Sequence, residues 1–415
     1  MTLRQILCSS FLISATACAL ADDWPQWRGP NRDDVSKETG LLQDWPAAGP
    51  KLAWKASGLG SGYSSVSVTQ GKIFTAGEVD ESSFIYALDL NGKKIWTAKL
   101  GTPGDPGQKG PGPRSTPSVD GDTVVNLGQM GDLVCLDSAS GKERWRKNLK
   151  RDLGGSQMSG WGYSESPLID GDKVIATPGG SGGTVVALSR KSGEVLWQTK
   201  DLTDRAGYSS VVPATIAGVR QYVQVTDANF VGLDPATGKI LWKGARRGQT
   251  AVIPTPIVSG DYVYEATGYG VGCSLFKITK EGSDFKADQV YANKTMINHH
   301  GGVVLVGENL YGFSDSGRPG VWVCQNFKSG EMVWSSNKLG KGSIVYADGR
   351  LILRQENGPG TIVLIEASPS GYKEHGRFDP PDRSNLNSWA HPVVANGILY
   401  LRDQDNLLAY DIKAK

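Results

Sequence analysis

Short apolar stretches separated by polar, glycine-containing turns recur along the chain from about residue 65 to its end. Each unit has an apolar strand, a turn and a second strand rich in β-branched residues, as in SVSVTQGKIFTAG (65–77) and HPVVANGILYLRD (391–403). Strands of this length joined by tight turns predict β-hairpins. Eight units occur, and their last apolar residues before the turn, from Val68 to Val394, are spaced 41 to 51 residues apart.

A second hairpin follows most of these units and ends in tryptophan. It reads ALDLNGKKIW at 87–96 and GLDPATGKILW at 232–242, with Asp at the turn and Gly four residues before Trp. Asp bonds the backbone of such turns, and Gly adopts the left-handed conformation. We expect each indole to be structural, buried against the next unit from the outermost strand. These residues are Trp54, Trp96, Trp145, Trp197, Trp242 and Trp334.

Two hairpins per repeat form a four-stranded sheet, so the pattern predicts an all-β fold, an eight-bladed β-propeller of four-stranded blades. No Trp-Asp dipeptide occurs, which excludes WD40 repeats. The last repeat stops three strands into its blade, and residues 51–54 carry a strand with its Trp, so we expect an N-terminal strand to close the ring. Repeats five and seven lack the Trp, and Val290 or Tyr291 and Phe378 lie near the expected Trp positions.

The chain begins with a positively charged, then apolar segment that ends in small residues before Asp22. This pattern is typical of a cleaved secretory signal peptide, assigned to 1–21, and predicts a periplasmic or secreted protein. Cys18 offers a lipoprotein site as the alternative, although no large aliphatic residue lies three positions before it. The organisation is then a signal peptide, an N-terminal extension over 22–50 and the propeller over 51–415.

Composition narrows the set of partners. The net charge of +2 gives no reason to expect a nucleic-acid partner, and no later segment is apolar enough to predict a transmembrane helix. The three cysteines beyond the predicted signal peptide have no common spacing, so we expect buried core thiols rather than a disulfide framework. These cysteines are Cys135, Cys273 and Cys324. The protein is expected to be a monomer.

The Ala-Leu-Asp…Gly…Trp hairpins resemble the repeats of the pyrroloquinoline quinone (PQQ) family, which includes quinoprotein alcohol dehydrogenases and BamB-like assembly proteins. The resemblance covers roughly 51–415, and the stretch DWPQWRGP at 23–30 is similar to the start of many secreted PQQ-like proteins. The resemblance to the dehydrogenases implies that PQQ lies above the central channel. There it would be held by a vicinal disulfide and by a Ca²⁺ ion with carboxylate and amide ligands. This chain has no adjacent cysteines and no matching ligand triplet. We therefore expect no cofactor, with PQQ and calcium as the alternative.

The segments that enter the innermost strands should converge on one face of the ring, where propellers bind small ligands. They concentrate aromatic, basic and imidazole side chains, the composition of a polar-ligand or sugar pocket. Adjacent His299 and His300 would alternate faces on a strand, so at most one is expected to point into the channel. A metal could be held by His299, His300 and His391. The candidate funnel residues are Tyr63, Arg114, Trp161, Tyr163, Glu165, Tyr208, Asn298, His299, His300, Lys341, Trp389 and His391.

Two classes of function follow from this composition. A non-catalytic binding or scaffold module would bind a protein or an envelope polysaccharide through its loops or strand edges. A quinoprotein-type or metal-dependent oxidoreductase, or a sugar-active enzyme, would use the His, Tyr and Arg groups of the central funnel. Nucleophile-elbow, phosphate-loop and dinucleotide-binding motifs are absent from the sequence, so it favours the binding module.

Overall fold

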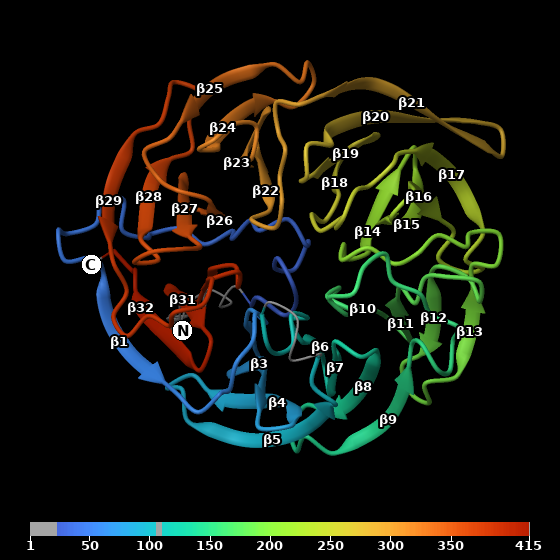
Figure 1. Cartoon of the computed structure of the whole chain (residues 1–415), viewed down its shortest axis with the longest axis horizontal. Coiled ribbons are helices and arrows are strands. Elements are labelled where there is room, and N and C mark those ends of the chain that lie inside the picture. The colour runs from blue at the N-terminus through green and yellow to red at the C-terminus, as the bar shows by residue number, and fades with distance from the viewer. Residues whose placement is uncertain (1–22, 105–109, 415) are drawn as a thin grey trace, which may run out of the picture.

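The computed structural model describes residues 23–104 and 110–414, which form a ring of eight four-stranded antiparallel sheets (Figure 1). The predicted eight-bladed β-propeller is therefore confirmed. The proposed signal peptide, 1–21, and Cys18 lie outside the described residues. Within the described ranges, no helix is long and apolar enough to cross a membrane.

The strands follow one another from the channel outwards in each blade. Blades 1 to 4 contain β2 (Ser67–Thr69), β3 (Lys72–Val79), β4 (Ser82–Asp89), β5 (Lys94–Gly101); β6 (Ser118–Asp120), β7 (Thr123–Leu127), β8 (Asp132–Asp137), β9 (Glu143–Asn148); β10 (Leu168–Asp170), β11 (Lys173–Ala176), β12 (Val186–Ser189), β13 (Val195–Gln198); β14 (Val212–Ile216), β15 (Val219–Val225), β16 (Asn229–Leu233) and β17 (Ile240–Ala245).

The second half of the ring repeats this arrangement. Blades 5 to 8 contain β18 (Ile257–Ser259), β19 (Tyr262–Thr267), β20 (Gly272–Glu281), β21 (Asp284–Asn293); β22 (Val303–Val306), β23 (Asn309–Ser314), β24 (Val321–Asn326), β25 (Met332–Ser336); β26 (Gly342–Ala347), β27 (Arg350–Gln355), β28 (Ile362–Glu366), β29 (Glu374–Phe378); β30 (Val393–Ala395), β31 (Ile398–Asp403), β32 (Asn406–Asp411) and β1 (Lys51–Ala56).

The N-terminal strand closes the ring as predicted. Strand β1 pairs antiparallel with β32, with Lys51 opposite Asp411 and Trp54 opposite Ala409. The two ends of the propeller are thus held in one sheet, which removes two exposed edges. The apolar clusters of the described residues lie between neighbouring blades. Phe74 of blade 1, for example, packs in one cluster with Val124 of blade 2.

A β-bulge interrupts each outermost strand, and in most blades the aromatic that faces the next blade directly follows the bulge. In blade 2 the bulge falls between Cys135 and Leu136, and Trp145 pairs with Cys135. The Trp145 ring then lies against Gly193 in the outer turn of blade 3, where an added Cβ would be 2.7 Å from the ring. The indole Nε1 donates to the carbonyl of Arg190 in the same turn, at 2.8 Å.

This contact recurs around the ring. In three more blades the indole Nε1 donates to a backbone carbonyl of the next blade. Trp96 donates to Ser138 at 3.2 Å, Trp197 to Pro235 at 3.2 Å and Trp334 to Ser368 at 2.9 Å. In blade 5 the role falls to Tyr291, the second of the two residues proposed from sequence. Its hydroxyl donates to the carbonyl of Phe327 at 3.0 Å.

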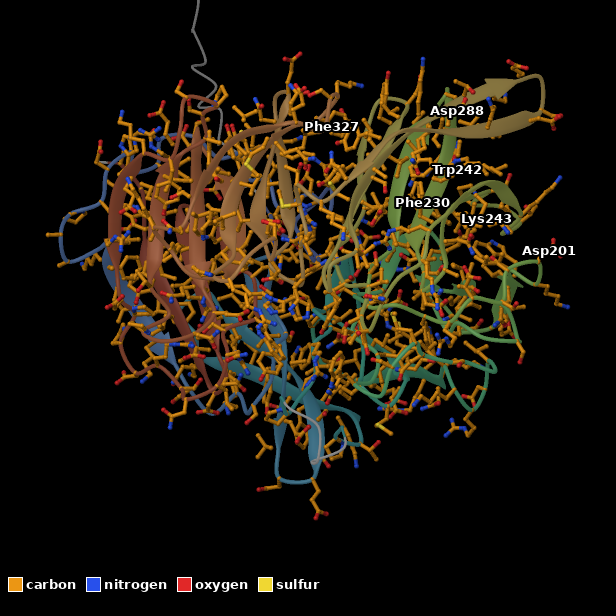
Figure 2. The ribbon with its side chains drawn as sticks, turned by 45° about the horizontal axis from the view of Figure 1, so that its top comes forward. Asp201, Phe230, Trp242, Lys243, Asp288 and Phe327 are labelled. Atoms are coloured by element: carbon orange, nitrogen blue, oxygen red, sulfur yellow. The ribbon has the colours of Figure 1, made fainter. Side chains whose placement is uncertain are left out.

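The junction between blades 4 and 5 departs from this pattern. The β20–β21 hairpin of blade 5 is long and extends beyond the ring, with Asp288 on its projecting arm (Figure 2). Trp242 of blade 4 therefore donates within its own blade, to Gln221 Oε1 at 2.6 Å. Phe230 fills the junction, in edge contact with Trp242 and with Phe276 of blade 5.

Blade 7 has no aromatic at the position beside the bulge, and Phe378 lies near that position, two residues further along β29. The residue at this position is Gly376, which pairs with Leu364 beside the bulge, whereas Phe378 pairs with Ile362. Trp45 of the N-terminal segment fills the space, since a Cβ on Gly376 would lie 2.5 Å from the Trp45 Cβ. Phe378 still makes the contact with the next blade, since a Cβ on Gly49 would lie 2.5 Å from its ring, and the ring is 4.9 Å from that of Tyr410 in blade 8.

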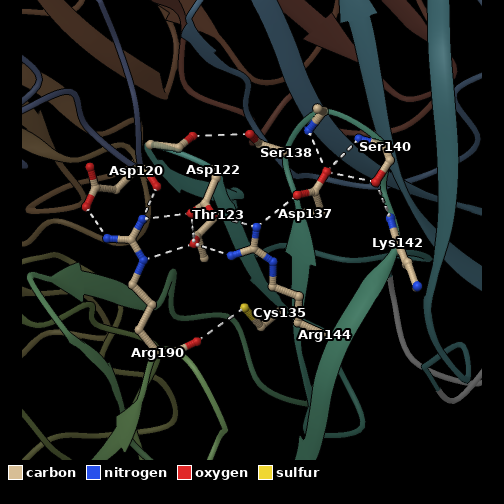
Figure 3. Close-up of polar contacts among 12 residues, drawn as sticks. Asp120, Asp122, Thr123, Cys135, Asp137, Ser138, Ser140, Lys142, Arg144 and Arg190 are labelled. Carbon is tan, nitrogen blue, oxygen red and sulfur yellow. Dashed lines mark hydrogen bonds and ion pairs between the residues drawn. The ribbon is translucent and has the colours of Figure 1, made fainter.

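An exposed ionic network links the two turns of blade 2 to each other and to the outer turn of blade 3 (Figure 3). Arg144 pairs with Asp122 and Asp137 at 2.7 and 2.8 Å, and Arg190 pairs with Asp120 at 2.6 Å. Such exposed pairs contribute little stability and mainly orient the turns. The cysteine beneath them is buried, as are the other two described cysteines, which are likewise free. Burial raises the pKa of Cys135 to about 12, which keeps its thiol protonated.

The contact between a Trp and the facing glycine gives a stability test. Gly141 has a φ of +70° and faces the Trp96 ring at 2.7 Å, whereas Gly171 has a φ of +59° and meets nothing within 4 Å. We expect G171A to lower the free energy of unfolding by about 1–2 kcal/mol, the cost of backbone strain. G141A adds overpacking and should cost a further ~1–3 kcal/mol. Denaturant titration of both variants measures the difference, and equal losses would contradict this account of the blade contact.

Candidate functional site

The segment over 24–36 enters the central channel. Trp24 pairs with Val68 at the end of the innermost strand of blade 1, and Ser36 donates its N–H to the carbonyl of Tyr346 in blade 7. The blue trace of this segment lies in the middle of the ring in Figure 1. The N-terminal extension is therefore part of the propeller and closes one face of the channel.

Buried arginines anchor this segment to the blades. Arg32 is 1% exposed, and its guanidinium donates to the carbonyls of Ser166, Pro167 and Val211 at 2.9, 2.6 and 3.0 Å. Burial lowers the pKa of Arg32 to about 9, and the negative potential of Glu165 opposes that shift. The guanidinium thus binds the entry segments of blades 3 and 4 with few neighbouring charges.

A second arginine forms a buried ion pair within the same segment. Arg28 Nε lies 2.9 Å from Asp34 Oδ2, and both side chains are 1% exposed. Another nitrogen of Arg28 donates to the carbonyl of Val303 in blade 6 at 2.6 Å. His391 contacts Asp34 through Nδ1 at 3.1 Å and the carbonyl of His300 through Nε2 at 2.9 Å. Arg28, Asp34 and His391 together connect the segment over 24–36 to blades 6 and 8.

Above this segment, on the face where chains enter the innermost strands, lies a cavity of about 250 Å³. Trp27 forms part of its lining and is held by an indole hydrogen bond to Thr255 Oγ1 at 3.0 Å. The walls are mainly aromatic rings in contact with one another. The lining residues are Trp27, Tyr63, Arg114, Trp161, Ser164, Ser166, Tyr208, Ser210, Ile253, Tyr269, His299, His300 and Trp389.

The rings form two connected groups around the cavity. Tyr63 and Trp389 have ring centroids 4.4 Å apart, and His300 lies 5.2 Å from Trp389. On the side of blades 3 and 4, Trp161 and Tyr208 lie 6.5 Å apart. The cavity therefore has aromatic surfaces from blades far apart in the ring.

Seven of the twelve residues proposed from sequence line this cavity. Both adjacent histidines are among them, so the expectation that at most one faces the channel is wrong. His299 and His300 lie in a bend before β22 rather than on a strand, and strand alternation does not apply to them. The seven are Tyr63, Arg114, Trp161, Tyr208, His299, His300 and Trp389.

The other five proposed residues lie outside the cavity lining. Tyr163 donates to the carbonyl of Pro178, and Asn298 donates to the carbonyls of Gly302 and Phe313. These two are buried hydrogen-bonding residues of the blade entries. The remaining three, Glu165, Lys341 and His391, bind neighbouring protein groups.

Glu165 is a buried carboxyl group within blade 3. It accepts from the backbone N–H of Thr177 and from Gln224 Nε2 at 3.4 Å. Burial raises its pKa to about 7, while the hydrogen bonds to Thr177 and the charge of Arg32 act in the opposite direction. The carboxyl group has a structural position beneath the cavity rather than one on its wall.

The two cavity histidines are engaged with protein partners. Lys341 Nζ lies 2.8 Å from His299 Nδ1 and 2.7 Å from Asp315, so Nδ1 accepts and the ring is neutral. Burial lowers the pKa of His299 to about 2, and the charges of His300 and Lys341 add to the effect. His300 Nε2 lies 2.8 Å from Glu356.

The three histidines proposed as metal ligands are not arranged as a ligand set. Both ring nitrogens of His391 have protein partners, and His299 Nδ1 is bonded to Lys341. In the described part of the chain, no group of three or more His, Cys, Asp or Glu residues could hold a metal ion. The aromatic walls would suit a flat molecule, but the lining has one arginine and no carboxylate. These residues do not fit PQQ with its calcium ion.

Six lining residues were not among the candidates from the sequence. Trp27 belongs to the N-terminal DWPQWRGP stretch, whose two tryptophans and arginine were the available signal. Tyr269 lies in the turn after β19 with a φ of +56°. The small and aliphatic lining residues carried no signal in the sequence. They are Ser164, Ser166, Ser210 and Ile253.

An eight-bladed ring with aromatic contacts between blades defines the class of PQQ-like β-propellers. The model of the family described as outer membrane protein assembly factor BamB matches residues 81–336. The chain therefore belongs to this family.

Curated relatives and solved structures agree with this assignment. The chain is 23% identical over 300 residues to BamB of Shewanella oneidensis, covering 69% of this chain and 68% of the relative. It is 25% identical to BamB of Yersinia pestis, covering 53% and 55%, so it spans about half of that protein. The crystal structure of BamB from Moraxella catarrhalis aligns with a TM-score of 0.62 at 18% identity, covering 89% and 99%.

The fold is also similar to that of quinohemoprotein alcohol dehydrogenase from Comamonas testosteroni. That structure aligns with a TM-score of 0.67 at 14% identity, covering 95% of this chain and 81% of the dehydrogenase. At this identity the likeness shows the fold alone.

The buried pair in the channel segment predicts a large effect of one substitution. D34N leaves Arg28 without its charge partner, and we expect the free energy of unfolding to fall by about 3–5 kcal/mol. The matched D382N breaks the exposed Lys55–Asp382 pair and should cost less than ~1 kcal/mol. Urea denaturation of both variants provides the comparison. Similar small losses in both would show that the ion pair does not anchor the segment.

The lowered pKa of His299 predicts a dependence of stability on pH. The unfolded histidine gains a proton below its ordinary pKa of 6.5, whereas the folded one does so only near 2. His299 therefore contributes stability above pH 6.5 that is lost as the pH falls below it. H299N should flatten the stability curve between about pH 4 and 6.5 relative to the wild type, because asparagine does not titrate. Wild-type curvature in H299N would contradict the assignment, and Glu165 contributes equally to both proteins.

Proposed function

We propose that the protein is a non-catalytic binding or scaffold propeller of the bacterial envelope. The observation that carries this proposal is that the imidazoles at the funnel are bonded to protein groups. His299 is bonded to Lys341, His300 to Glu356 and His391 to Asp34. A general acid or base needs a pKa near the working pH, and the pKa of about 2 keeps His299 far from that range.

A protein partner is the favoured ligand of the ring exterior. Relatives named outer membrane protein assembly factor support a role in assembly. Outermost strands keep apolar side chains on the surface, and Leu196 of β13 and Val333 of β25 are 48% and 42% exposed. Each is the extra residue of the bulge in its outer strand, so it has no partner in the register with the neighbouring strand. Exposed apolar edges of this kind suit contact with another chain.

A location outside the cytoplasm is part of the same proposal. The predicted signal peptide and the name of the relatives favour a periplasmic or secreted protein that works as a monomer. The closed ring supports the monomer because its first and last strands are paired with each other. A polysaccharide of the envelope is a further proposed ligand, for the funnel rather than the edges.

Site-specific crosslinking tests the scaffold proposal. A photoreactive residue at position 196 should give a discrete protein adduct in envelopes of the producing bacterium, and one at position 386, on an exposed loop, should not. L196E should lower recovery of that partner at least about tenfold, whereas L386E should leave it unchanged. No adduct at 196, or dye-linked alcohol oxidation by the full chain with PQQ and Ca²⁺, would contradict the proposal.

A further inference from the structure

We propose that the funnel cavity is a binding site for one acidic pyranose, a sugar ring that carries a carboxylate. This site is separate from the outer strands that we propose for protein contact. Four properties of the cavity support the inference: its size, its aromatic walls, its unpaired hydrogen-bonding groups and its charge.

The size and shape of the cavity suit a single ring. Its volume of about 250 Å³ lies below the roughly 300–1,000 Å³ of pockets for larger ligands. Tyr63 and Trp389 form an aromatic surface from blades 1 and 8, and Trp161 and Tyr208 form another from blades 3 and 4. The C–H faces of a pyranose pack on such rings. Trp27 contributes to the lining from the N-terminal segment.

Polar groups of the lining have hydrogen-bonding capacity to spare. Ser166 and Ser210 accept backbone N–H groups through Oγ, each at 2.9 Å, which leaves both hydroxyl hydrogens available to donate. The Ser164 hydroxyl and the Trp389 indole Nε1 are buried and have no hydrogen-bond partner among the described residues. Unmet buried donors cost free energy, and a ligand rich in oxygen atoms satisfies them.

Charge at the cavity favours an anion. Arg114 lines it and donates to the carbonyls of Trp161 and Gly110 at 2.9 and 3.1 Å, with its guanidinium 5.7 Å above the Tyr63 ring. Across the described ranges, no carboxylate forms an ion pair with Arg114, and Glu78 acts on it only through space. Burial lowers the pKa of Arg114, and the potentials of Tyr63, Tyr208 and Glu78 act in the opposite direction. A ligand carboxylate at the cavity wall would pair with the guanidinium through charge-assisted hydrogen bonds.

Calorimetric titration of the full chain with D-glucuronate tests the proposal. We expect one saturable site, with D-glucose bound at least about tenfold more weakly because it lacks the carboxylate. R114Q should reduce glucuronate affinity about tenfold or more and change glucose affinity less than about twofold. R151Q, which alters an exposed arginine of blade 2, should bind glucuronate as the wild type does. W389F keeps a ring but removes the indole N–H, and should weaken both sugars several-fold.

Four results would overturn the proposal: no saturable glucuronate binding to the wild type, equal affinity for glucose and glucuronate, full glucuronate affinity in R114Q, or tighter binding of benzoate than of glucuronate. Circular dichroism and thermal unfolding establish that each variant is folded. The test is independent of the scaffold proposal, because L196E should leave glucuronate binding unchanged and R114Q should leave crosslinking at position 196 unchanged.

Discussion

The contact between an outer-strand aromatic and the next blade's turn is the interaction on which the ring depends. Each blade is a thin sheet whose apolar faces are covered only by its neighbours. The bulge sets the angle of the aromatic, the facing glycine gives it room, and a turn carbonyl accepts the indole hydrogen, as with Trp145, Gly193 and Arg190. Burial and a directional bond act together, so the contact fixes the spacing between blades as well as contributing stability.

The N-terminal segment extends this principle to the places where the repeats are incomplete. Trp45 occupies the space beside Gly376 of blade 7, and β1 supplies the last strand of blade 8. The same segment then fills the channel with Arg28, Arg32 and Asp34, whose burial is offset by carbonyls and by the ion pair. A passage through the ring thereby becomes a cavity with a defined lining. The N-terminal segment therefore both closes the ring and completes the cavity.

The sequence predicted the parts of the structure that local patterns encode. Strand alternation, turn glycines and the recurring Trp determined eight blades, the closing strand and Tyr291 as a substitute for Trp. The missed features depend on contacts between residues distant in sequence. Gly376 is small because Trp45 occupies its space, and Trp27 reaches the cavity because Arg32 binds carbonyls of blades 3 and 4. For His299 and His300 the strand rule failed because the chain bends before β22.

The electrostatics of the funnel separate binding from catalysis. In PQQ-like folds the same face could hold a reactive group, yet here the imidazoles have protein partners and His299 is kept neutral by burial and by the Lys341 ammonium. Arg114 differs, because among the described residues its guanidinium donates to carbonyls and lies over an aromatic face. A buried charge at a cavity wall has an energetic cost that a complementary ligand relieves. This cost is the physical basis of our proposal that the funnel binds an anion.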